Sequence, residues 1–334
     1  MMKRAWLAAV AALVVAAPAW AAGSYRLVKS VTIGGDTFWD YLTFDASSHR
    51  LYIAHGTHVV VVDTERYAVV GDIGGTPGVH GVALADDLGK GFISAGGSNE
   101  VVVFDPRTLA VTGRIPVGER PDAIRYDAPT HLVLTFNAVS HDTTVIDAVA
   151  GRVVGTIALD GKPEEAVSDG HGHLYDNLED VSQIVELDPV KLRVTHRWSL
   201  APCQEPTGLA FDVAHARLFA ACGNEMMAVV DAHNGRVVTT VPTGKHSDGA
   251  GFDPGTGDVL IPDGEGKLTV IHEDTPDRYH LVANVPTQPG ARTMAYDPAT
   301  HRFFTATADL TPNPQGRPRY RMTPGSFRLL VYGP

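Results

Sequence analysis

The segment Asp40-Tyr-Leu-Thr-Phe-Asp45 decides the fold, because six related segments follow it at nearly constant spacing. Every copy begins with a polar residue and has an apolar centre, and all but the second close on Asp. A fixed period of this size marks supersecondary units that stack on one another to bury a shared core. The copies begin at Asp40, His80, Asp122, Glu164, Thr207, Asp248 and Arg292, in steps of 40, 42, 42, 43, 41 and 44 residues.

Each repeat contains four expected strands. An Asp-centred turn such as Asp127-Ala-Pro-Thr-His131 follows the first strand, because Asp and Pro favour tight turns. A second strand such as Arg50–Ala54, a β-branched third strand such as Val59–Asp63 and a Val-rich fourth strand such as Val69–Ile73 come next. No long apolar period of 3.6 residues is present, so helices should be scarce. The sequence therefore predicts an all-β protein, a seven-bladed β-propeller of four-stranded blades.

The last repeat is one strand short. It offers Thr293–Tyr296, Arg302–Ala306 and Phe327–Tyr332, after which the chain ends. An unassigned strand, Tyr25–Ile33, precedes the first repeat. We expect this N-terminal strand to pair beside Phe327–Tyr332 and to close the ring, which removes an open sheet edge. Residues 22–334 are thus predicted to form one propeller domain.

Residues 1–21 have the pattern of an export signal. Lys3 and Arg4 precede an apolar run from Ala5 to Ala17, and Ala19-Trp20-Ala21 fits a cleavage site. The apolar run is too short to span a bilayer. We expect a signal peptide that is cleaved to leave a mature chain without a membrane span. The mature protein is expected in the periplasm, or secreted.

Composition argues against one class of partner. The chain has 34 Gly and 22 Pro, and only 19% of its residues are charged, which is typical of many short strands and turns. Its formal net charge is −11, and no basic stripe is present. A nucleic-acid partner is therefore not expected, since binding to phosphate backbones requires clustered Lys and Arg.

The third strands carry a resemblance to a known family. Val59-Val-Val-Val-Asp-Thr64 and Val101-Val-Val-Phe-Asp-Pro106, each followed by a Val-rich strand, resemble YVTN-type repeats. Over roughly residues 25–332 the chain is similar to the bacterial YncE-like seven-bladed propellers, although a strict Tyr-Val-Thr-Asn is absent. The resemblance implies the fold. It implies no catalytic residues, because related propellers include binding proteins, surface proteins and enzyme domains.

The first residues of the repeats are expected at the mouth of the central channel. Four of the seven are carboxylates and one is His, whereas Asp and Glu make up 38 of 334 residues overall. The loops between the second and third strands should reach the same face and add polar side chains. The candidate ligand-binding residues at the mouth are Asp40, His55, His80, Asp122, Asn137, Glu164, Asn177, Asn224, His246, Asp248 and Arg292.

Two interpretations of this polar ring stay open. Oxygen ligands suit hard cations such as Ca²⁺, and an added His favours a transition metal such as Zn²⁺. Glu164 and Asp248 are the candidate metal ligands. Alternatively, strand-initiating positions hold polar residues that cap backbone groups in turns.

Cys203 and Cys222 should flank one hairpin of the fifth repeat on the mouth face. In an oxidising compartment they are expected to form a disulfide, which would stabilise the fold by roughly 3 kcal/mol in the chain-entropy model. A reactive thiol or a metal-binding thiolate pair is the alternative. Covalent c-type haem is excluded, because no Cys-x-x-Cys-His is present.

The segment Thr311–Gly325 is a Pro-rich basic insertion containing Arg317, Arg319 and Arg321. It is either a lid or clamp for an anionic group at the mouth, or a plain insertion. Signatures of nucleophile elbows, P-loops and zinc proteases are absent.

The leading hypothesis for function is a binding module that holds a small molecule or a periplasmic protein at its mouth. A metal-dependent hydrolase or lyase, for example a lactonase, is the alternative. It would combine metal-holding carboxylates with a general acid or base. A structural envelope protein that uses the ring only as a platform is a third class.

Overall fold

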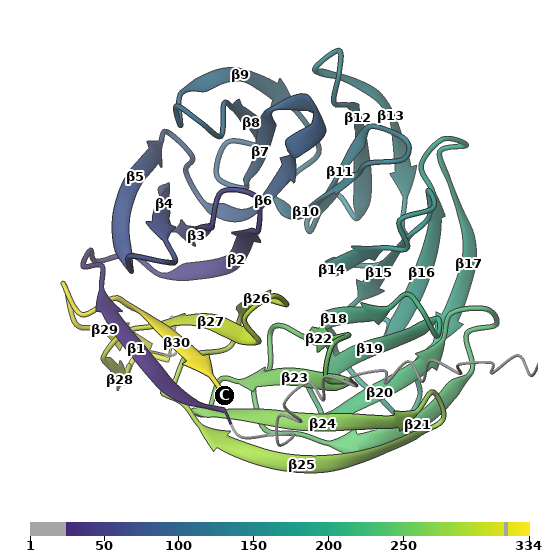
Figure 1. Cartoon of the computed structure of the whole chain (residues 1–334). Coiled ribbons are helices and arrows are strands. Elements are labelled where there is room, and N and C mark those ends of the chain that lie inside the picture. Colours follow the sequence, from purple (N-terminus) through teal and green to yellow (C-terminus); the bar gives the residue numbers. More distant parts are fainter. Residues whose placement is uncertain (1–24, 317–319) are drawn as a thin grey trace, which may run out of the picture.

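The protein folds into a ring of seven four-stranded antiparallel sheets, shown in Figure 1. The computed structural model describes residues 25–316 and 320–334. Each blade runs from an innermost strand at the channel to an outermost strand at the outer edge of the ring. This architecture confirms the all-β propeller predicted from the repeats, whereas the predicted signal peptide lies outside the described residues.

The strands follow the four-strand order of the repeats. The innermost strands are β2 (Trp39–Asp45), β6 (Val79–Ala85), β10 (Pro121–Asp127), β14 (Pro163–Ser168), β18 (Pro206–Asp212), β22 (Gly251–Asp253) and β26 (Met294–Asp297). The second strands are β3 (Arg50–His55), β7 (Lys90–Ala95), β11 (Leu132–Asn137), β15 (Leu174–Leu178), β19 (Arg217–Cys222), β23 (Asp258–Asp263) and β27 (Arg302–Thr307). The third strands are β4 (His58–Asp63), β8 (Glu100–Phe104), β12 (Asp142–Asp147), β16 (Gln183–Asp188), β20 (Met226–Asp231), β24 (Lys267–Thr275) and β30 (Arg328–Gly333). The outermost strands are β5 (Ala68–Gly74), β9 (Val111–Pro116), β13 (Arg152–Ala158), β17 (Arg193–Ser199), β21 (Val237–Pro242), β25 (Arg278–Pro286) and β1 (Arg26–Thr32).

Strand β1 closes the ring as the sequence predicted. It pairs antiparallel with β30, from Arg26 opposite Gly333 to Thr32 opposite Arg328. The two strands lie side by side in Figure 1, although they come from opposite ends of the chain. The side chains of β1 are mostly exposed, so its main-chain hydrogen bonds, rather than buried apolar area, join it to the last blade.

Apolar side chains fill the spaces between neighbouring blades. Between the first two blades, for example, Tyr52 and Ile93 pack with Phe104, and all three are fully buried. Each blade is twisted, so its two faces meet those of its neighbours and exclude water.

The innermost strands are also linked directly around the channel. Thr43 donates a 2.8 Å hydrogen bond to the carbonyl of Val82 in the next blade. Thr293 in the last blade donates one of 2.8 Å to the carbonyl of Asp40 in the first. These links keep the starts of the inner strands close together.

The inner strands of the last two blades begin later than expected. The repeat pattern places the start of the sixth inner strand at Asp248 and predicts Thr293–Tyr296 in the seventh blade, whereas β22 begins at Gly251 and β26 at Met294. The backbone N–H of Asp248 donates to the carbonyl of Arg292, 3.2 Å away in the neighbouring blade, instead of to its own sheet. A Cβ at Gly249 would lie 3.3 Å from the backbone of Thr293. Glycine therefore permits a close approach that draws this segment toward the next blade.

Helical structure is confined to one short turn, Asp86–Leu88, within the described residues. No helix in that part of the chain has the length and apolarity needed to cross a membrane. The basic insertion overlaps a small hairpin, β28 (Leu310–Pro312) and β29 (Tyr320–Met322), between β27 and β30. Its Arg317 and Arg319 lie outside the described residues.

We expect proline in β1 to open the ring. Antiparallel pairing uses the N–H groups of alternate residues, so one of Ser30→Pro and Val31→Pro should remove a ladder bond and cost about 1–3 kcal/mol. Ser30→Ala and Val31→Ala keep the N–H groups and serve as controls. Urea unfolding measures the difference, and two proline variants as stable as their controls would contradict closure by β1.

Candidate functional site

We call the first residues of the seven repeats the rim residues. In the first five blades they share one structural position. Each is the second residue of its inner strand and follows a buried residue such as Trp39 or Val79. The start of each inner strand pairs with the end of the second strand, as Trp39 pairs with His55. The rim and the loops after the second strands therefore share one face, as the sequence predicted.

Three rim residues from adjacent blades meet at the mouth. Nδ1 of His80 lies 2.6 Å from Oδ2 of Asp40 and 3.5 Å from Oδ1 of Asp122. One ligand atom from each of the three lies within 4.8 Å of the other two. All three side chains are less than one-fifth exposed. We call this group the rim triad.

Neighbouring groups hold the rim triad in place. The Asp40 carbonyl accepts the Thr293 hydroxyl, and the Ser94 hydroxyl donates to the Asp122 carbonyl at 2.5 Å. A Cβ at Gly96 would lie 3.0 Å from the His80 ring, so the absence of a side chain there leaves room for the imidazole.

Burial and charge together shift the protonation of the rim triad. Burial, reinforced by the charges of Asp40 and Asp248, raises the pKa of Asp122 to about 7, although His80 opposes the shift. Burial lowers the pKa of His80, but the hydrogen bond with Asp40 and the charge of Asp122 outweigh it and raise that pKa. The triad can therefore hold either a proton on His80 or a metal ion between the same three ligand atoms.

The candidate metal ligand Glu164 forms an ion pair with a lysine side chain. The ammonium of Lys162 bridges Glu164 and Glu179. Burial and the charge of Asp122 raise the pKa of Glu164. Burial also raises the pKa of Glu179, but hydrogen bonds with Glu164 and Lys162 outweigh it and lower that pKa. Glu164 is thus the carboxyl of this pair that retains a proton more readily.

The other candidate metal ligand, Asp248, is paired with Arg292. Nε of Arg292 donates a 2.5 Å hydrogen bond to Oδ2 of Asp248, and Nη2 lies 3.5 Å from the carbonyl of Trp39. Burial raises the pKa of Asp248, although Arg292 opposes this shift. The structure therefore brings neither Glu164 nor Asp248 into the rim triad.

Several amides predicted at the mouth make hydrogen bonds within the scaffold. Asn137 donates to Asp142 at 2.6 Å, and Asn177 donates to the carbonyl of Gly208 at 3.0 Å. His55 stacks on Phe327, with ring centroids 4.2 Å apart. Burial and the charge of neighbouring His58 lower the pKa of His55 to about 4. These residues support the loops and blade contacts around the mouth.

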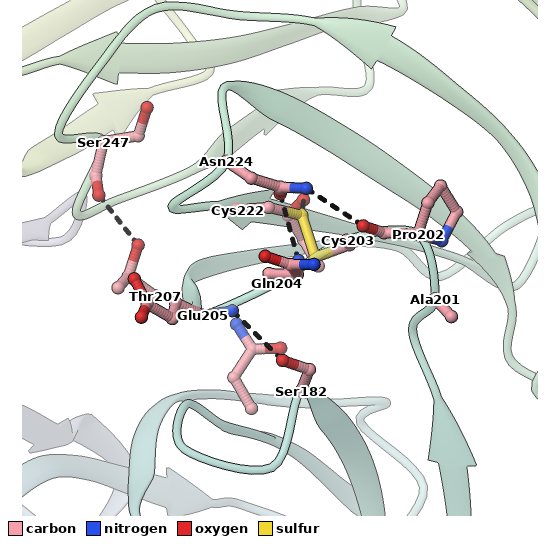
Figure 2. The surroundings of a disulfide bond; sticks show 12 residues. Ser182, Ala201, Pro202, Cys203, Gln204, Glu205, Thr207, Cys222, Asn224 and Ser247 are labelled. Carbon is pink, nitrogen blue, oxygen red and sulfur yellow. Dashed lines mark hydrogen bonds between the residues drawn. A yellow bond between two sulfur atoms is a disulfide. The ribbon is translucent and has the colours of Figure 1, made fainter.

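The two cysteines form the disulfide that the sequence favoured. Figure 2 shows the Cys203–Cys222 bond between the segment before β18 and the end of β19. Asn224 lies beside it and bonds to the backbone of both Gln204 and Pro202, each at 3.0 Å. Asn224 therefore stabilises the disulfide loop.

An apolar pocket lies beside Arg292, one of the residues predicted at the mouth. It has a volume of about 280 Å³ and takes residues from blades 1, 6 and 7. Leu310 and Tyr320 of the small hairpin form part of its wall, so the basic insertion reaches the mouth. Nε1 of Trp39 is buried without a hydrogen-bond partner within the described structure. The lining residues are Phe38, Trp39, His246, Gly264, Gly290, Arg292, Leu310 and Tyr320.

Buried charges lie deeper, between the third and fourth blades. Glu165 pairs with Arg125, and Asp176 is fully buried. Burial raises the pKa of Glu165 to about 7, and burial also raises that of Asp176. Sequence analysis did not single these residues out. The repeat alignment contained a signal for them. Glu165 stands where the second blade has Gly81, and Asp176 stands where the first blade has the buried Ile53.

We expect Asp122→Asn to change how stability depends on pH. The pKa of Asp122 is higher in the folded than in the unfolded protein, so the folded state binds more protons between about pH 4 and pH 7. The free energy of unfolding of the metal-free wild type should fall across this window because of Asp122. Urea unfolding measures this effect. Relative to the wild type, the free energy of unfolding of Asp122→Asn should be higher at pH 8 than at pH 4.5, by about 1 kcal/mol or more.

Asp105→Asn is the control for that measurement. Backbone hydrogen bonds from Arg107 lower the pKa of Asp105, so its folded and unfolded values both lie below pH 4.5. Its difference from the wild type should stay constant across the window. Parallel profiles for Asp122→Asn and the wild type would show that Asp122 is not destabilised by ionisation.

The comparisons with known proteins identify the fold. No family model and no curated protein matches the sequence. The structure is similar to a chain of hydrazine synthase from Kuenenia stuttgartiensis, with a TM-score of 0.71 and 17% identity over 82% of this chain and 93% of that chain. It is also similar to a chain in a crystal structure of the mitotic checkpoint complex, with a TM-score of 0.75 and 13% identity over 98% of this chain and 99% of that chain. At these identities the likeness shows a shared propeller fold alone.

Proposed function

We propose that this protein is an exported, YncE-like binding propeller that holds a divalent metal ion in the rim triad and, through it, a small molecule. The observation that carries the proposal is the convergence of Asp40, His80 and Asp122 at the mouth. Two carboxylates and one imidazole suit a transition metal such as Zn²⁺ better than Ca²⁺, which prefers oxygen ligands alone. Three protein ligands leave a coordination position for a ligand from solution.

The apolar pocket lined by Trp39 and Arg292 supports a ligand with an apolar body. Phe38 and Trp39 line it directly before Asp40 in the chain, and Leu310 also forms part of its wall. Small-molecule sites are mostly apolar, with a few polar groups that fix orientation. The ligand class is therefore a small molecule that has a metal-binding oxygen group and an apolar or aromatic portion.

Two observations support export to the periplasm. Residues 1–21 have the charged start, apolar run and cleavage pattern of a signal peptide. The Cys203–Cys222 disulfide is of a kind that persists in oxidising compartments. Membership of the YncE-like family is part of the proposal and rests on the Val-rich third strands.

The proposal predicts one zinc equivalent that depends on His80. Chelator-treated protein titrated with Zn²⁺ in a calorimeter should lose one bound equivalent in His80→Ala. His196→Ala is the matched control, because His196 also pairs with a carboxylate, Glu186, but is largely exposed on an outer strand. Equal stoichiometry in His80→Ala and the wild type would rule out a metal site at the rim triad.

The same protein tests the ligand pocket. A small aryl hydroxamate supplies metal-binding oxygens and an aromatic ring, and it should bind only after zinc loading. Leu310→Lys fills the pocket with a charged chain, so it should weaken hydroxamate binding while zinc binding is retained. Unchanged hydroxamate affinity in Leu310→Lys would place the ligand elsewhere.

A metal-dependent hydrolase or lyase is the second candidate, and one observation favours it. The raised pKa of Glu164 lets this carboxyl keep a proton near the rim triad, which suits a general acid. Glu164→Gln should then abolish hydrolysis of simple lactones by the zinc-loaded protein while zinc affinity stays within a few fold. Zinc-loaded wild type that leaves a panel of lactones intact would favour the binding module.

A further inference from the structure

A second site is indicated where two blades depart from the repeat on the face opposite the mouth. In four Asp-centred turns, the third residue after Asp is Ser or Thr, and its hydroxyl donates to Oδ2 of that Asp at 2.5–2.8 Å. In the fifth blade this position is His215, whose Nδ1 lies 2.5 Å from Oδ2 of Asp212. An imidazole therefore replaces the hydroxyl that completes the other turns. The four hydroxyl residues are Ser48, Thr130, Thr256 and Thr300.

The neighbouring sixth blade departs from the repeat at Glu273. Its backbone N–H bonds to the carbonyl of Gly257, the same contact that Thr64, Ala148 and Ala232 make in their own blades. Those three residues are small and buried, whereas Glu273 places a carboxylate at this position. The sixth blade allows this because β24 runs on to Thr275, beyond the point where the third strands of the first, third and fifth blades end.

These two departures meet in the groove between the fifth and sixth blades. Oε1 of Glu273 lies 3.2 Å from Nδ1 of His215. One ligand atom each from Asp212, His215 and Glu273 lies within 4.8 Å of the others. The three residues line a cavity of about 300 Å³ together with Phe252 and Pro276.

Glu273 lacks the hydrogen bonds that a buried carboxylate requires. Its side chain is 4% exposed, and within the described structure its carboxylate contacts only members of the same group: Oε1 lies 3.2 Å from Nδ1 of His215, and Asp212 is its other polar neighbour. Nδ1 of His215 is already engaged with Asp212 at the shorter distance. A buried charge without such partners is costly unless a cation compensates it. The carboxylate is therefore directed into a group that is incomplete with protein atoms alone.

The other charged groups around the cavity are already paired. The guanidinium of Arg217 contacts Asp231 and Asp277 and donates to the carbonyl of Pro276. Asp274 on the cavity wall pairs with Arg278 and His280. Asp212 and Glu273 share the single ring of His215 as their ion-pair partner among the described residues, and a divalent cation would compensate both carboxylates.

We propose that Asp212, His215 and Glu273 form a second metal site, for a divalent transition metal of the Zn²⁺ class. Asp212 would supply Oδ2, since its Oδ1 accepts the backbone N–H of Ala214. His215 would supply Nδ1, and its half-exposed ring leaves the other nitrogen to carry the proton in water. The metal joins the fifth and sixth blades and has a free position toward the cavity.

Zn²⁺ titration of the chelator-treated full chain tests this site with variants that restore the repeat. His215→Thr introduces the residue of three other turns, and Glu273→Ala introduces the residue of two other blades, so both should fold. Each should weaken binding of one zinc equivalent by about 100-fold or more, beyond the loss typical of an outer-shell change. Zinc should raise the melting temperature of the wild type, because it binds the folded state. That increase should be smaller in both variants.

Two further variants separate this site from the mouth. Thr130→His places an imidazole beside Asp127 in the third blade, where the next blade has Pro189 instead of Glu, and it should add no zinc equivalent. His80→Ala should leave the equivalent that depends on His215 in place. Unchanged zinc binding in His215→Thr and Glu273→Ala would overturn the second site, whatever His80→Ala shows. A double variant of His80 and His215 that still binds two equivalents would overturn both sites.

Discussion

Closure of the ring is the constraint on which the rest of this structure depends. Main-chain pairing of β1 with β30 joins the first and last parts of the chain. Thr293 then reaches the carbonyl of Asp40, although 253 positions separate them in sequence. A closed ring brings the starts of all seven inner strands to one end of the channel. Polar side chains that are some 40 residues apart in the chain therefore become neighbours at the mouth.

Crowding at the mouth has an electrostatic cost. Burial raises the pKa values of Asp122, Glu164 and Asp248, so ionised carboxylates are disfavoured there. Lys162 and Arg292 offset part of the negative charge through direct contacts. Groups that reduce stability are expected at functional sites, because function rather than packing maintains them. The rim triad fits this description best, since it combines two carboxylates with an imidazole of the type that binds metals.

The repeats supply an internal standard for reading the remaining sites. Most turns of the opposite face satisfy their Asp with a Ser or Thr from the same turn, as Thr256 does for Asp253. His215 replaces that hydroxyl in the fifth blade. Glu273 of the sixth blade replaces a small buried residue, and the two side chains are in contact. Two independent departures that converge on one cavity are more informative than any single unusual residue.

The sequence by itself determined the period, the four-strand order, the closing strand and the cysteine pair. These features follow from local patterns, because β-branched runs, Asp-centred turns and a fixed repeat length specify strands and their order. The tertiary structure decided which rim carboxylates pair with a Lys or Arg side chain. Glu164 and Asp248 occupy the same repeat position as Asp40 and Asp122. Among the ion pairs of the described residues, however, Lys162 pairs with Glu164 and Arg292 pairs with Asp248.

The sequence also could not predict that Asp212, His215 and Glu273 lie together. His215 and Glu273 are 58 positions apart, and their contact depends on the twist of one blade against the next and on the extra length of β24. Strand patterns predict the path of the backbone, but they do not specify the direction and reach of long polar side chains across a blade interface. Only the packed ring determines which charges are buried together and which are paired.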